Sequence, residues 1–308
     1  MKKNKLMFDI TDTSTSNPVD SASIYAAALI AGGSKETFTP LLDVKDKARI
    51  RKGGFGNVLQ SDSCAFNDQG AGTLSEKLVD ACPVKVNFSI CQSTLETSFV
   101  GHSMKAGSTS ADFLPEDFRT YLTSELSKKM SADFEIMTWA GDSANTGSTY
   151  PNNLCNGLIV QFAADADVID VTAATISSSN VIAELNRVYD ALPQAVKFSP
   201  EMRMYVSSNV LGAYKQATAA ASAEVFYVKD AVPSFLGIPM ILAQGLGIDQ
   251  MVAAETTNLF LISDLLSDFE DIRILPQLDV TGDDSVRVVG RVKYAVSYAY
   301  GAEVVLYN

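Results

Sequence analysis

Residues 115–141 read PEDFRTYLTSELSKKMSADFEIMTWAG, and this stretch decides how the rest of the chain is interpreted. Its large apolar residues recur every three or four positions and would form one stripe along a helix: Phe118, Leu122, Leu126, Met130, Phe134 and Met137. Pro115 suits a first turn, the acids after it suit the positive end of the helix dipole, and Gly141 stands where a C-terminal cap is expected. A helix over 115–140 would be about 39 Å long at 1.5 Å per residue. That length predicts a structural spine.

A polar loop follows this helix and leads to an apolar run that begins at Leu158. Loops rich in Gly, Ser, Thr and Asn often carry active sites, but no catalytic partner accompanies this one. Its side chains can bond backbone groups locally and form tight turns: Asp142, Ser143, Asn145, Asn152 and Asn153. We expect Trp139, the single tryptophan, to anchor the helix end by burying its ring. The loop is then a structural crossing to the next part of the chain.

The chain before the helix divides into two parts. Residues 1–44 are rich in Ser, Thr, Asp and Ala, with one short helical stretch near 21–30. They hold too few large apolar residues for a core of their own, which predicts an extended arm. Residues 45–100 place five glycines between β-prone runs such as VKVNFSI. That pattern is typical of a long, twisted hairpin.

The chain after the loop mixes helices and strands. SSSNVIAELNRVYDALP reads as an amphipathic helix with Asn180 as N-cap and Pro193 as stop, and SNVLGAYKQATAAA as a second helix. MRMYVSS, IPMILAQG and NLFLISD read as strands, the last two buried, so a compact α/β unit is expected. From Phe269 onward nearly every run is strand-like, and Tyr294 to Tyr300 alternate large and small residues.

Composition narrows the function classes. The chain has 308 residues, 47% hydrophobic and only 19% charged, which suggests that other protein covers part of its surface. The net charge is −12, and residues 161–284 hold 17 acidic against 6 basic side chains. Such a chain is a poor phosphate binder, because affinity for nucleic acid comes largely from Lys and Arg. The basic stretch KDKARIRK, residues 45–52, is either a solvated strand or loop or a binding patch.

Cysteine and histidine usage argues against a metal site. Cys64, Cys82, Cys91 and Cys155 form no CxxC pair, and His102 is the single histidine, so no His-based zinc site is available. Free thiols in a reducing compartment are favoured over disulfides. MKKNKLMFDITDTS has no apolar region behind its basic residues, and YAAALIA at 25–31 is too short to span a bilayer. We expect a soluble protein made in a cytoplasm.

The search for catalytic patterns gives no catalytic, cofactor-binding or metal-binding residue. No phosphate loop and no GxSxG elbow is present, and GGFG at 53–56 lacks the lysine and the helix that would cradle a phosphate. His102 has no partner placed beside it by spacing. The acids at 283–284 fit a hairpin tip. A second group lacks the alternation of a calcium loop and suits a solvated edge: Asp264, Asp268, Glu270 and Asp271. The chain is expected not to be an enzyme.

Taken together, the order of elements resembles a known family. The chain begins with an arm and a glycine-rich hairpin, followed by a helix that starts at a proline and ends in WAGD. It continues with an α/β unit that contains GIPMI and NLFLISD, and it closes with the strands VRVVGRVKYAVSYAYGAEVVLY. This order resembles the major capsid protein of tailed bacteriophages with the Hong Kong 97 fold, over most of residues 40–308. The stretch LSEKLVDACPVKVNFSICQSTLETSF is similar to capsid proteins of phages that infect Bacteroidetes-type hosts.

The resemblance implies an α+β fold with defined parts. Residues 1–44 would be the N-arm that reaches a neighbouring subunit, and 45–100 the extended loop lying across the next subunit. Residues 101–159 would hold the peripheral domain with its spine helix at 115–140. Residues 160–262 would form the axial domain, 263–300 the returning peripheral strands, and 301–308 a final strand back in the axial domain. The candidates for inter-subunit contacts are Lys45, Lys47, Arg49, Arg51, Lys52 and Phe55.

The implied function is structural. The chain would assemble with itself into pentamers and hexamers of an icosahedral head shell, with a portal protein at one vertex, around double-stranded DNA that it does not bind sequence-specifically. It would be a virion component assembled in the host bacterial cytoplasm, without cofactor or membrane. The arm pattern close behind Met1 implies a separate scaffold protein, or none, and decoration proteins are an open partner class. No Lys–Asn pairing predicts covalent crosslinks. Two alternatives stay open: an encapsulin-type nanocompartment shell, and an enzyme using His102 or the acids at 264–271.

Overall fold

The computed structural model describes residues 33–42, 44, 46–55, 59, 61–62, 64, 72–91, 116–147, 149–221, 233–264, 273–277, 281–283 and 285–308. Several sequence predictions lie outside these residues: the helical stretch near 21–30, Lys45, His102 and three of the four acids at 264–271. Among the helices of the described residues, none combines the length and apolar character that a membrane span requires.

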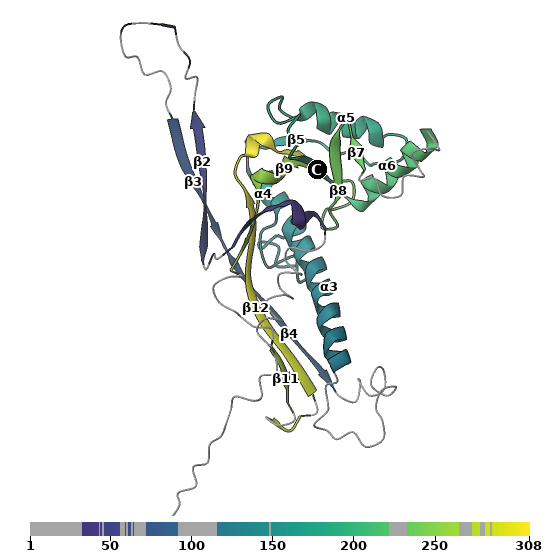
Figure 1. Ribbon diagram of the computed structural model, residues 1–308. Coiled ribbons are helices and arrows are strands. Elements are labelled where there is room, and N and C mark those ends of the chain that lie inside the picture. The colour runs from purple at the N-terminus through teal and green to yellow at the C-terminus, as the bar shows by residue number, and fades with distance from the viewer. Residues whose placement is uncertain are drawn as a thin grey trace, which may run out of the picture.

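The long helix α3 runs over Glu116–Ala140, where the sequence predicts a helix over 115–140. It lies alongside the long strands β4 and β12 (Figure 1). Its apolar stripe explains this packing, because Met130, Phe134 and Met137 are all buried in the same core cluster. The Phe134 ring packs on that of Tyr294 in β12, with centroids 5.0 Å apart. The helix is therefore held by one face against a sheet.

That sheet has five strands and is organised around β12 (Ser285–Tyr298). Strand β4 (Cys82–Cys91) pairs antiparallel with one edge of β12 over ten residues, from Cys82↔Tyr294 to Cys91↔Ser285. The opposite edge pairs antiparallel with β11 (Arg273–Pro276) and, further along, with β10 (Leu259–Ser263). Short β1 (Thr39–Leu41) adds a parallel strand beside β10. Buried positions alternate along most of β12, as expected for a strand with one packed face.

Two strands belong to this sheet although the sequence suggested other places for them. Strand β4 was expected within the extended loop 45–100, but it pairs with β12, because its alternate residues Val84, Val86, Phe88 and Ile90 pack into the core beside α3. Strand β10, from NLFLISD, was expected in the α/β unit and instead also pairs with β12. Alternating apolar residues show that a strand has a packed face, but they do not identify the strand it pairs with.

The α/β unit contains a six-stranded sheet. Its order is β5 (Ile169–Val171), β13 (Val305–Tyr307), β9 (Met251–Glu255), β6 (Met202–Val206), β8 (Ile238–Leu242) and β7 (Ser234–Phe235). Helices α5 (Val181–Ala191) and α6 (Ser208–Ala221) share its core cluster. The last strand, β13, returns the chain to this unit by pairing with β9 and β5. Asn180 is the N-cap residue of α5, as predicted, but its amide oxygen accepts from the Ser177 backbone N–H and makes no capping hydrogen bond to the helix.

A shared core joins the α/β unit to the five-stranded sheet. Helix α4 (Leu158–Ala164) packs between them, and Trp139 at the end of α3 is fully buried. The Trp139 ring contacts Tyr205 of β6 at 5.1 Å and Phe38 at 5.9 Å between centroids. Its indole Nε1 donates to Ser34 Oγ at 2.7 Å. Trp139 therefore joins the end of α3 to the α/β unit and to the segment at 33–41.

The segment at 33–41 is more than an arm. The sequence assigned 1–44 to an arm without a core, yet Phe38 and the polar residues Ser34 and Lys35 are buried. Short helix η2 (Ser34–Thr37) lies against α3, where Glu135 Oε1 accepts from the Ser34 backbone at 3.2 Å. Lys35 Nζ donates to the Ser131 carbonyl at 2.9 Å. Because these contacts are hydrogen bonds made by polar residues, the hydrophobicity of the sequence did not indicate that this segment packs on α3.

Gly141 ends α3 for a reason different from the expected one. Its φ does not lie in the left-handed region that a glycine cap usually adopts. A Cβ at Gly141 would lie 2.3 Å from the Cys155 carbonyl oxygen and 2.7 Å from that of Met137. The Gly157 N–H donates to the Gly141 carbonyl at 2.8 Å, so the two ends of the loop 141–157 touch through backbone. Glycine is needed here because the chain passes so close to itself.

We expect Gly141→Ala to destabilise the fold by about 2–4 kcal/mol, since backbone must move to admit the methyl group. Gly212→Ala is the matched control: Gly212 lies inside α6 and a Cβ there meets nothing within 4 Å. That substitution should stabilise by about 0.5–1 kcal/mol through helix propensity. Urea unfolding of both variants measures the difference. Equal midpoints would show that Gly141 is not sterically required.

Candidate assembly interface

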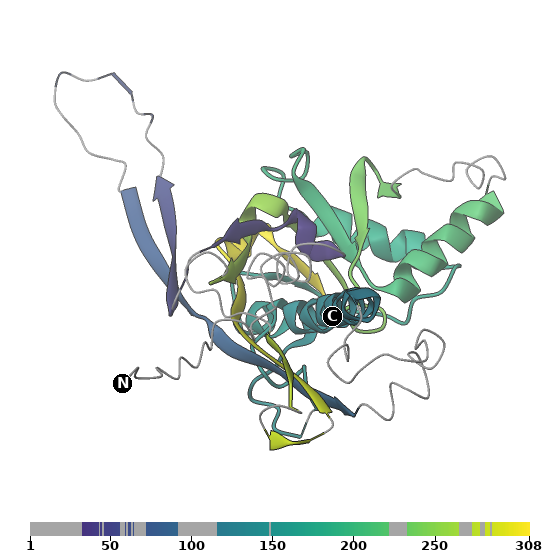
Figure 2. The same cartoon turned by 60° about the horizontal axis from the view of Figure 1, so that its bottom comes forward.

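A two-stranded sheet projects from the body of the molecule. Strand β2 (Lys47–Phe55) pairs antiparallel with β3 (Gly72–Asp80) over nine residues, from Lys47↔Asp80 to Phe55↔Gly72. The paired strands are roughly 30 Å long at 3.4 Å per residue, and Figure 1 shows the outer end of this β2–β3 hairpin pointing away from the rest of the chain. Figure 2, which views α3 nearly end-on, shows the hairpin and the α5–α6 unit on opposite sides of that helix.

One face of the hairpin, here called the outer face, is solvent-exposed and mixes charge with leucine. By the register of the two strands it carries Lys47, Arg49 and Arg51 on β2 and Leu74, Glu76, Leu78 and Asp80 on β3. Leu74 is 90% exposed and Leu78 is 58% exposed. Leu74 and Leu78 lie on the same face of a thin sheet, on either side of Glu76, and apolar side chains this exposed make the face a candidate contact surface for another protein.

The basic residues of the outer face are paired within the hairpin itself. Lys47 contacts Asp80 at 3.1 Å, and Arg49 and Arg51 both contact Glu76, at 3.6 and 3.5 Å. All these side chains are substantially exposed, so each pair contributes little to stability. Their charges remain available to a partner.

The other face of the hairpin is fixed to the body at its foot. Ala48 and Ile50 are buried, and Ala48 packs with Ile262 of β10 and Ala295 of β12. Further out, the Tyr300 hydroxyl accepts from the Gly53 N–H at 3.2 Å and donates to the Gly53 carbonyl at 3.1 Å. The inner contacts therefore set the direction in which the hairpin leaves the body.

Lys77 of β3 adds a charged contact at the same foot. Its Nζ lies 3.5 Å from the centroid of the Tyr298 ring and 3.5 Å from the Tyr298 carbonyl oxygen. The Tyr298 hydroxyl donates to Asp165 Oδ2 at 2.7 Å, and this hydrogen bond lowers the pKa of Asp165. Burial lowers the pKa of Lys77 to about 8, and nearby Lys52 adds to the effect. One line of contacts thus runs from the hairpin through β12 to the end of α4.

The sequence-predicted contact residues are placed as follows. Lys47, Arg49 and Arg51 lie on the outer face, whereas Lys52 lies on the inner side near Lys77. Phe55 ends β2, and its side chain, like all of Lys45, is outside the described residues. Sequence reasoning missed Leu74, Leu78 and Lys77. The sequence does show that Leu74 and Leu78 would share one face of a strand and that Lys77 would lie on the other. It does not show which face is exposed, because that depends on how β3 pairs with β2.

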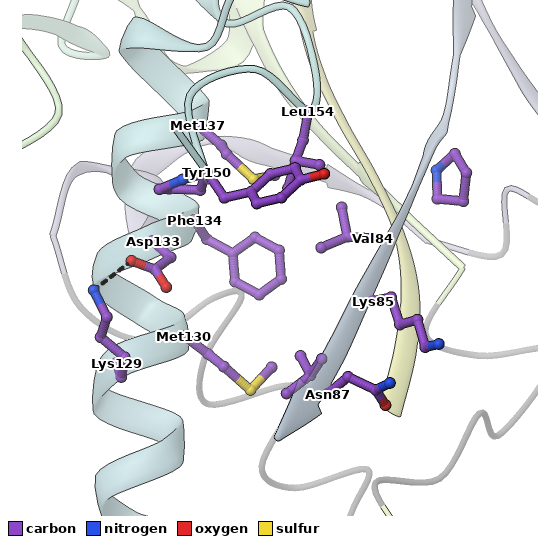
Figure 3. A pocket seen from close by; sticks show the side chains of 13 residues that line it. Val84, Lys85, Asn87, Lys129, Met130, Asp133, Phe134, Met137, Tyr150 and Leu154 are labelled. Carbon is purple, nitrogen blue, oxygen red and sulfur yellow. Dashed lines mark hydrogen bonds and ion pairs between the residues drawn. The ribbon is translucent and has the colours of Figure 1, made fainter. Parts of the chain in front are cut away.

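A cavity of about 570 Å³ lies between α3 and β4 and is shown in Figure 3. Val84 of β4, Phe134 of α3 and Leu154 of the following loop face it, and Tyr150 stands at its mouth. Of the three charged residues in its lining, Lys129 and Asp133 pair with each other at 2.7 Å, and Lys85 belongs to β4. Within the described ranges, no group of three or more His, Cys, Asp or Glu side chains is placed so that it could hold a metal ion. The lining offers shape but no set of converging reactive groups.

Stability should depend on pH through buried lysines and tyrosines. Burial lowers the pKa of Lys35 to about 8, as for Lys77, from an ordinary 10.5. Between these values the unfolded chain binds more protons than the folded chain, so stability rises with pH. Burial raises the pKa of Tyr205 and Tyr294 above the ordinary 10.0, so stability falls once the unfolded tyrosines ionise.

We therefore expect the melting temperature of the unassembled chain to rise from pH 8 to about 10 and to fall above it. Lys35→Met, which keeps an unbranched side chain one atom shorter and cannot titrate, should flatten the rising part. Scanning fluorimetry across this range is the measurement. A melting temperature that falls steadily from pH 8 in the unsubstituted chain would contradict the assignment of low pKa values to these lysines.

Comparison with known proteins gives structural relatives only. No protein-family model matches the chain, and neither does any curated protein. A chain of the satellite phage P4 procapsid superposes with a TM-score of 0.61 at 13% identity, covering 93% of this chain and 98% of that chain. The capsid of a native GTA particle gives 0.55 at 11% identity, over 91% and 89%. A virus-like particle from Pyrococcus furiosus gives 0.54 at 10% identity, over 94% and 98%.

These superpositions span nearly the whole chain, although few residues are identical. At such identities the likeness establishes the fold and leaves the function to be argued from the molecule's own surfaces. The chain has the fold of phage capsid shell proteins.

Proposed function

We propose that this chain is the major capsid protein of a tailed phage. It would self-assemble into pentamers and hexamers of an icosahedral head shell that encloses double-stranded DNA. The observation that carries the proposal is the β2–β3 hairpin on a chain with a capsid fold. A two-stranded sheet is marginally stable in water unless its faces are packed, and this one packs only the foot of its inner face while its outer face exposes Leu74 and Leu78. A neighbouring copy that covers this face would stabilise the two-stranded sheet and would remove the two leucines from water.

The Hong Kong 97-like arrangement gives each part a role. The hairpin would be the extended loop that lies across the next subunit, and α3 the spine of the peripheral domain. The six-stranded sheet with α5 and α6 would form the axial domain around fivefold and sixfold axes. Residues 1–32 would continue from the segment at 33–41 as the arm onto a neighbour. Each role places a thin or extended segment where another subunit can bury it.

The distribution of charge on the chain favours contacts between copies of the chain over contacts with DNA. The described strands of the hairpin carry five basic residues and two acidic ones, whereas the whole chain has a net charge of −12. A basic hairpin on an acidic subunit is attracted to the acidic surface of another copy. The same net charge gives little grip on phosphates, so the genome would be enclosed without sequence-specific binding and driven in by a motor.

The proposal implies partners and a place. A portal protein would occupy one vertex, and scaffold and decoration proteins are partner classes that the chain leaves open. The shell would assemble in the cytoplasm of the bacterial host and become part of the virion. The resemblance of residues 74–99 favours a Bacteroidetes-type host. The role is structural and non-enzymatic.

A second candidate is the shell of an encapsulin-type nanocompartment. The likeness to a virus-like particle from Pyrococcus furiosus, over almost the whole of both chains, is the observation that favours it. The two functions differ in content: a phage head encloses DNA, and a compartment encloses cargo proteins. A portal and packaging-motor gene beside this one supports the phage head, and a gene for an enzyme with a docking tail supports the compartment.

The test is negative-stain electron microscopy of the protein expressed alone and co-expressed with the products of its neighbouring genes. Closed shells, or rings of five and six subunits, are expected in at least one of the two preparations. A chain that remains monomeric at high concentration in both would contradict the proposed function. Shells that hold protein cargo and no DNA after co-expression would favour the compartment.

A further inference from the structure

Two cysteines that are far apart in the sequence meet at one residue of β12. Cys82 begins β4 and is the partner of Tyr294 in the β4–β12 pairing. Cys155 lies in the loop after α3, and its Sγ donates to the carbonyl oxygen of Tyr294 at 3.9 Å. Cys155 is buried and Cys82, partly exposed, packs against the same core cluster. Tyr294 thus gathers both side chains at the edge of the sheet.

The two thiols also contact each other. The side chains of Cys82 and Cys155 share a hydrogen bond beside Tyr294, and this bond lowers the pKa of Cys82. The same bond, together with burial, raises the pKa of Cys155. Attack on an external disulfide requires a thiolate that solvent can reach, and Cys82 is partly exposed whereas Cys155 is buried, so Cys82 is the nucleophile of the pair and Cys155 the residue that follows it.

The other two described cysteines are placed differently. Cys64 and Cys91 are exposed, and Cys91 ends β4 opposite Ser285, roughly 30 Å along the strand from Cys82. A disulfide requires Cα atoms within about 7 Å. Within one folded chain, Cys91 therefore cannot reach Cys82, and it serves as an internal control.

We propose that Cys82 and Cys155 are a modification site that forms an intrachain disulfide when the folded chain meets a disulfide oxidant such as glutathione disulfide. The Cys82 thiolate attacks one sulfur of the oxidant, giving a mixed disulfide and one glutathione thiolate. Cys155, losing its proton to solvent, then attacks the Cys82 sulfur and displaces the second glutathione. Two protein thiols become one disulfide, one oxidant disulfide becomes two thiols, and the two protons released end on those thiols.

The disulfide would join covalently two parts of the molecule that otherwise meet through non-covalent contacts. Cys82 precedes Pro83 and Cys155 follows Leu154, and both of these neighbours line the cavity between α3 and β4. Figure 3 shows Val84 and Leu154 facing this cavity from their separate elements. The disulfide would tie β4 to the loop after α3 and restrict the unfolded chain. If the proposed function holds, oxidation outside the reducing cytoplasm would reinforce finished shells and would not affect assembling subunits.

The test uses the full-length chain, purified reduced under native conditions and divided into two samples. One sample keeps dithiothreitol and the other receives glutathione disulfide. Both are then alkylated in denaturant with iodoacetamide, digested and analysed by mass spectrometry. After oxidation we expect the peptide with Cys82 linked to the peptide with Cys155, two hydrogen atoms lighter than their sum. The oxidised sample should also melt several degrees higher than the reduced one.

Three variants assign the steps. In the Cys155→Ser variant the reaction should stop at a mixed disulfide between Cys82 and glutathione. In the Cys82→Ser variant Cys155 should remain unreacted. The Cys91→Ser variant should form the disulfide between Cys82 and Cys155 as the unsubstituted chain does. The proposal is overturned if both thiols of the unsubstituted oxidised chain are alkylated. A Cys82 that stays joined to glutathione, to Cys91 or to a second chain would overturn it equally. Because this readout does not need assembled shells, its failure is distinguishable from failure of the proposed function.

Discussion

Replacing Leu74 and Leu78 together with glutamate is expected to abolish shell assembly while leaving the subunit folded. Both side chains lie on the outer face of the β2–β3 hairpin and are largely exposed in the single chain, so charge there costs the isolated fold little. In a shell they would be buried on a neighbour, where each leucine contributes about 1.5–3 kcal/mol. Losing about 3 kcal/mol per subunit raises the concentration needed for assembly roughly a hundredfold.

The measurement compares the assembled fraction, by sedimentation and electron microscopy, with the melting temperature of the unassembled chain. Leu74→Met with Leu78→Met is the matched control, because methionine keeps the apolar surface and a similar volume. It should assemble as the unsubstituted chain does. Normal shells from the double glutamate variant would show that the outer face is not a contact between subunits.

Trp139→Ala is expected to cause the largest loss of stability of any single substitution considered. The ring is fully buried and touches Tyr205 and Phe38, so its removal leaves a large cavity between α3, the α/β unit and the segment at 33–41. Truncation of a buried tryptophan costs about 3–5 kcal/mol, a large share of the 5–15 kcal/mol typical of whole domains. We expect a much lower yield of soluble protein and a melting temperature lower by roughly 6–20 °C.

Two milder changes separate the parts of this effect. Trp139→Phe keeps an aromatic ring but loses the hydrogen bond to Ser34, and it should cost less than the alanine variant. Ser34→Ala removes the acceptor and leaves the buried indole N–H unsatisfied, at about 1–3 kcal/mol. Urea unfolding gives all three values. An alanine variant as stable as Ser34→Ala would mean that the ring packing contributes nothing, contrary to this account.

The parts of the fold that could be predicted from the sequence are those with local causes. Helix α3 lies within one residue of its predicted bounds at each end, because a 3.6-residue period over so many residues is specific. The hairpin at β2 and β3 followed from glycines between β-prone runs. The buried Trp139 followed from ring size alone.

The parts that could not be predicted depend on contacts between distant residues. Both β4 and β10 pair with β12, which is distant from β4 in the sequence. Their residue patterns would have allowed each of them to pair with other strands equally well. The buried polar contacts of Ser34 and Lys35 with α3 have no periodic signal. The described basic residues that the sequence offered as contact candidates lie on β2, in the hairpin that we propose as the interface. The leucines of its outer face and the Lys77–Tyr298 contact required the register of β2 with β3 and the position of β12.

The most direct test of the central claim is a cryo-electron microscopy reconstruction of the particles that this chain forms. We predict a closed icosahedral shell of pentamers and hexamers, in which the β2–β3 hairpin of each subunit lies across a neighbouring copy with Leu74 and Leu78 buried. A particle in which the outer face of the hairpin remains in solvent, or in which subunits meet through other surfaces alone, would contradict the account.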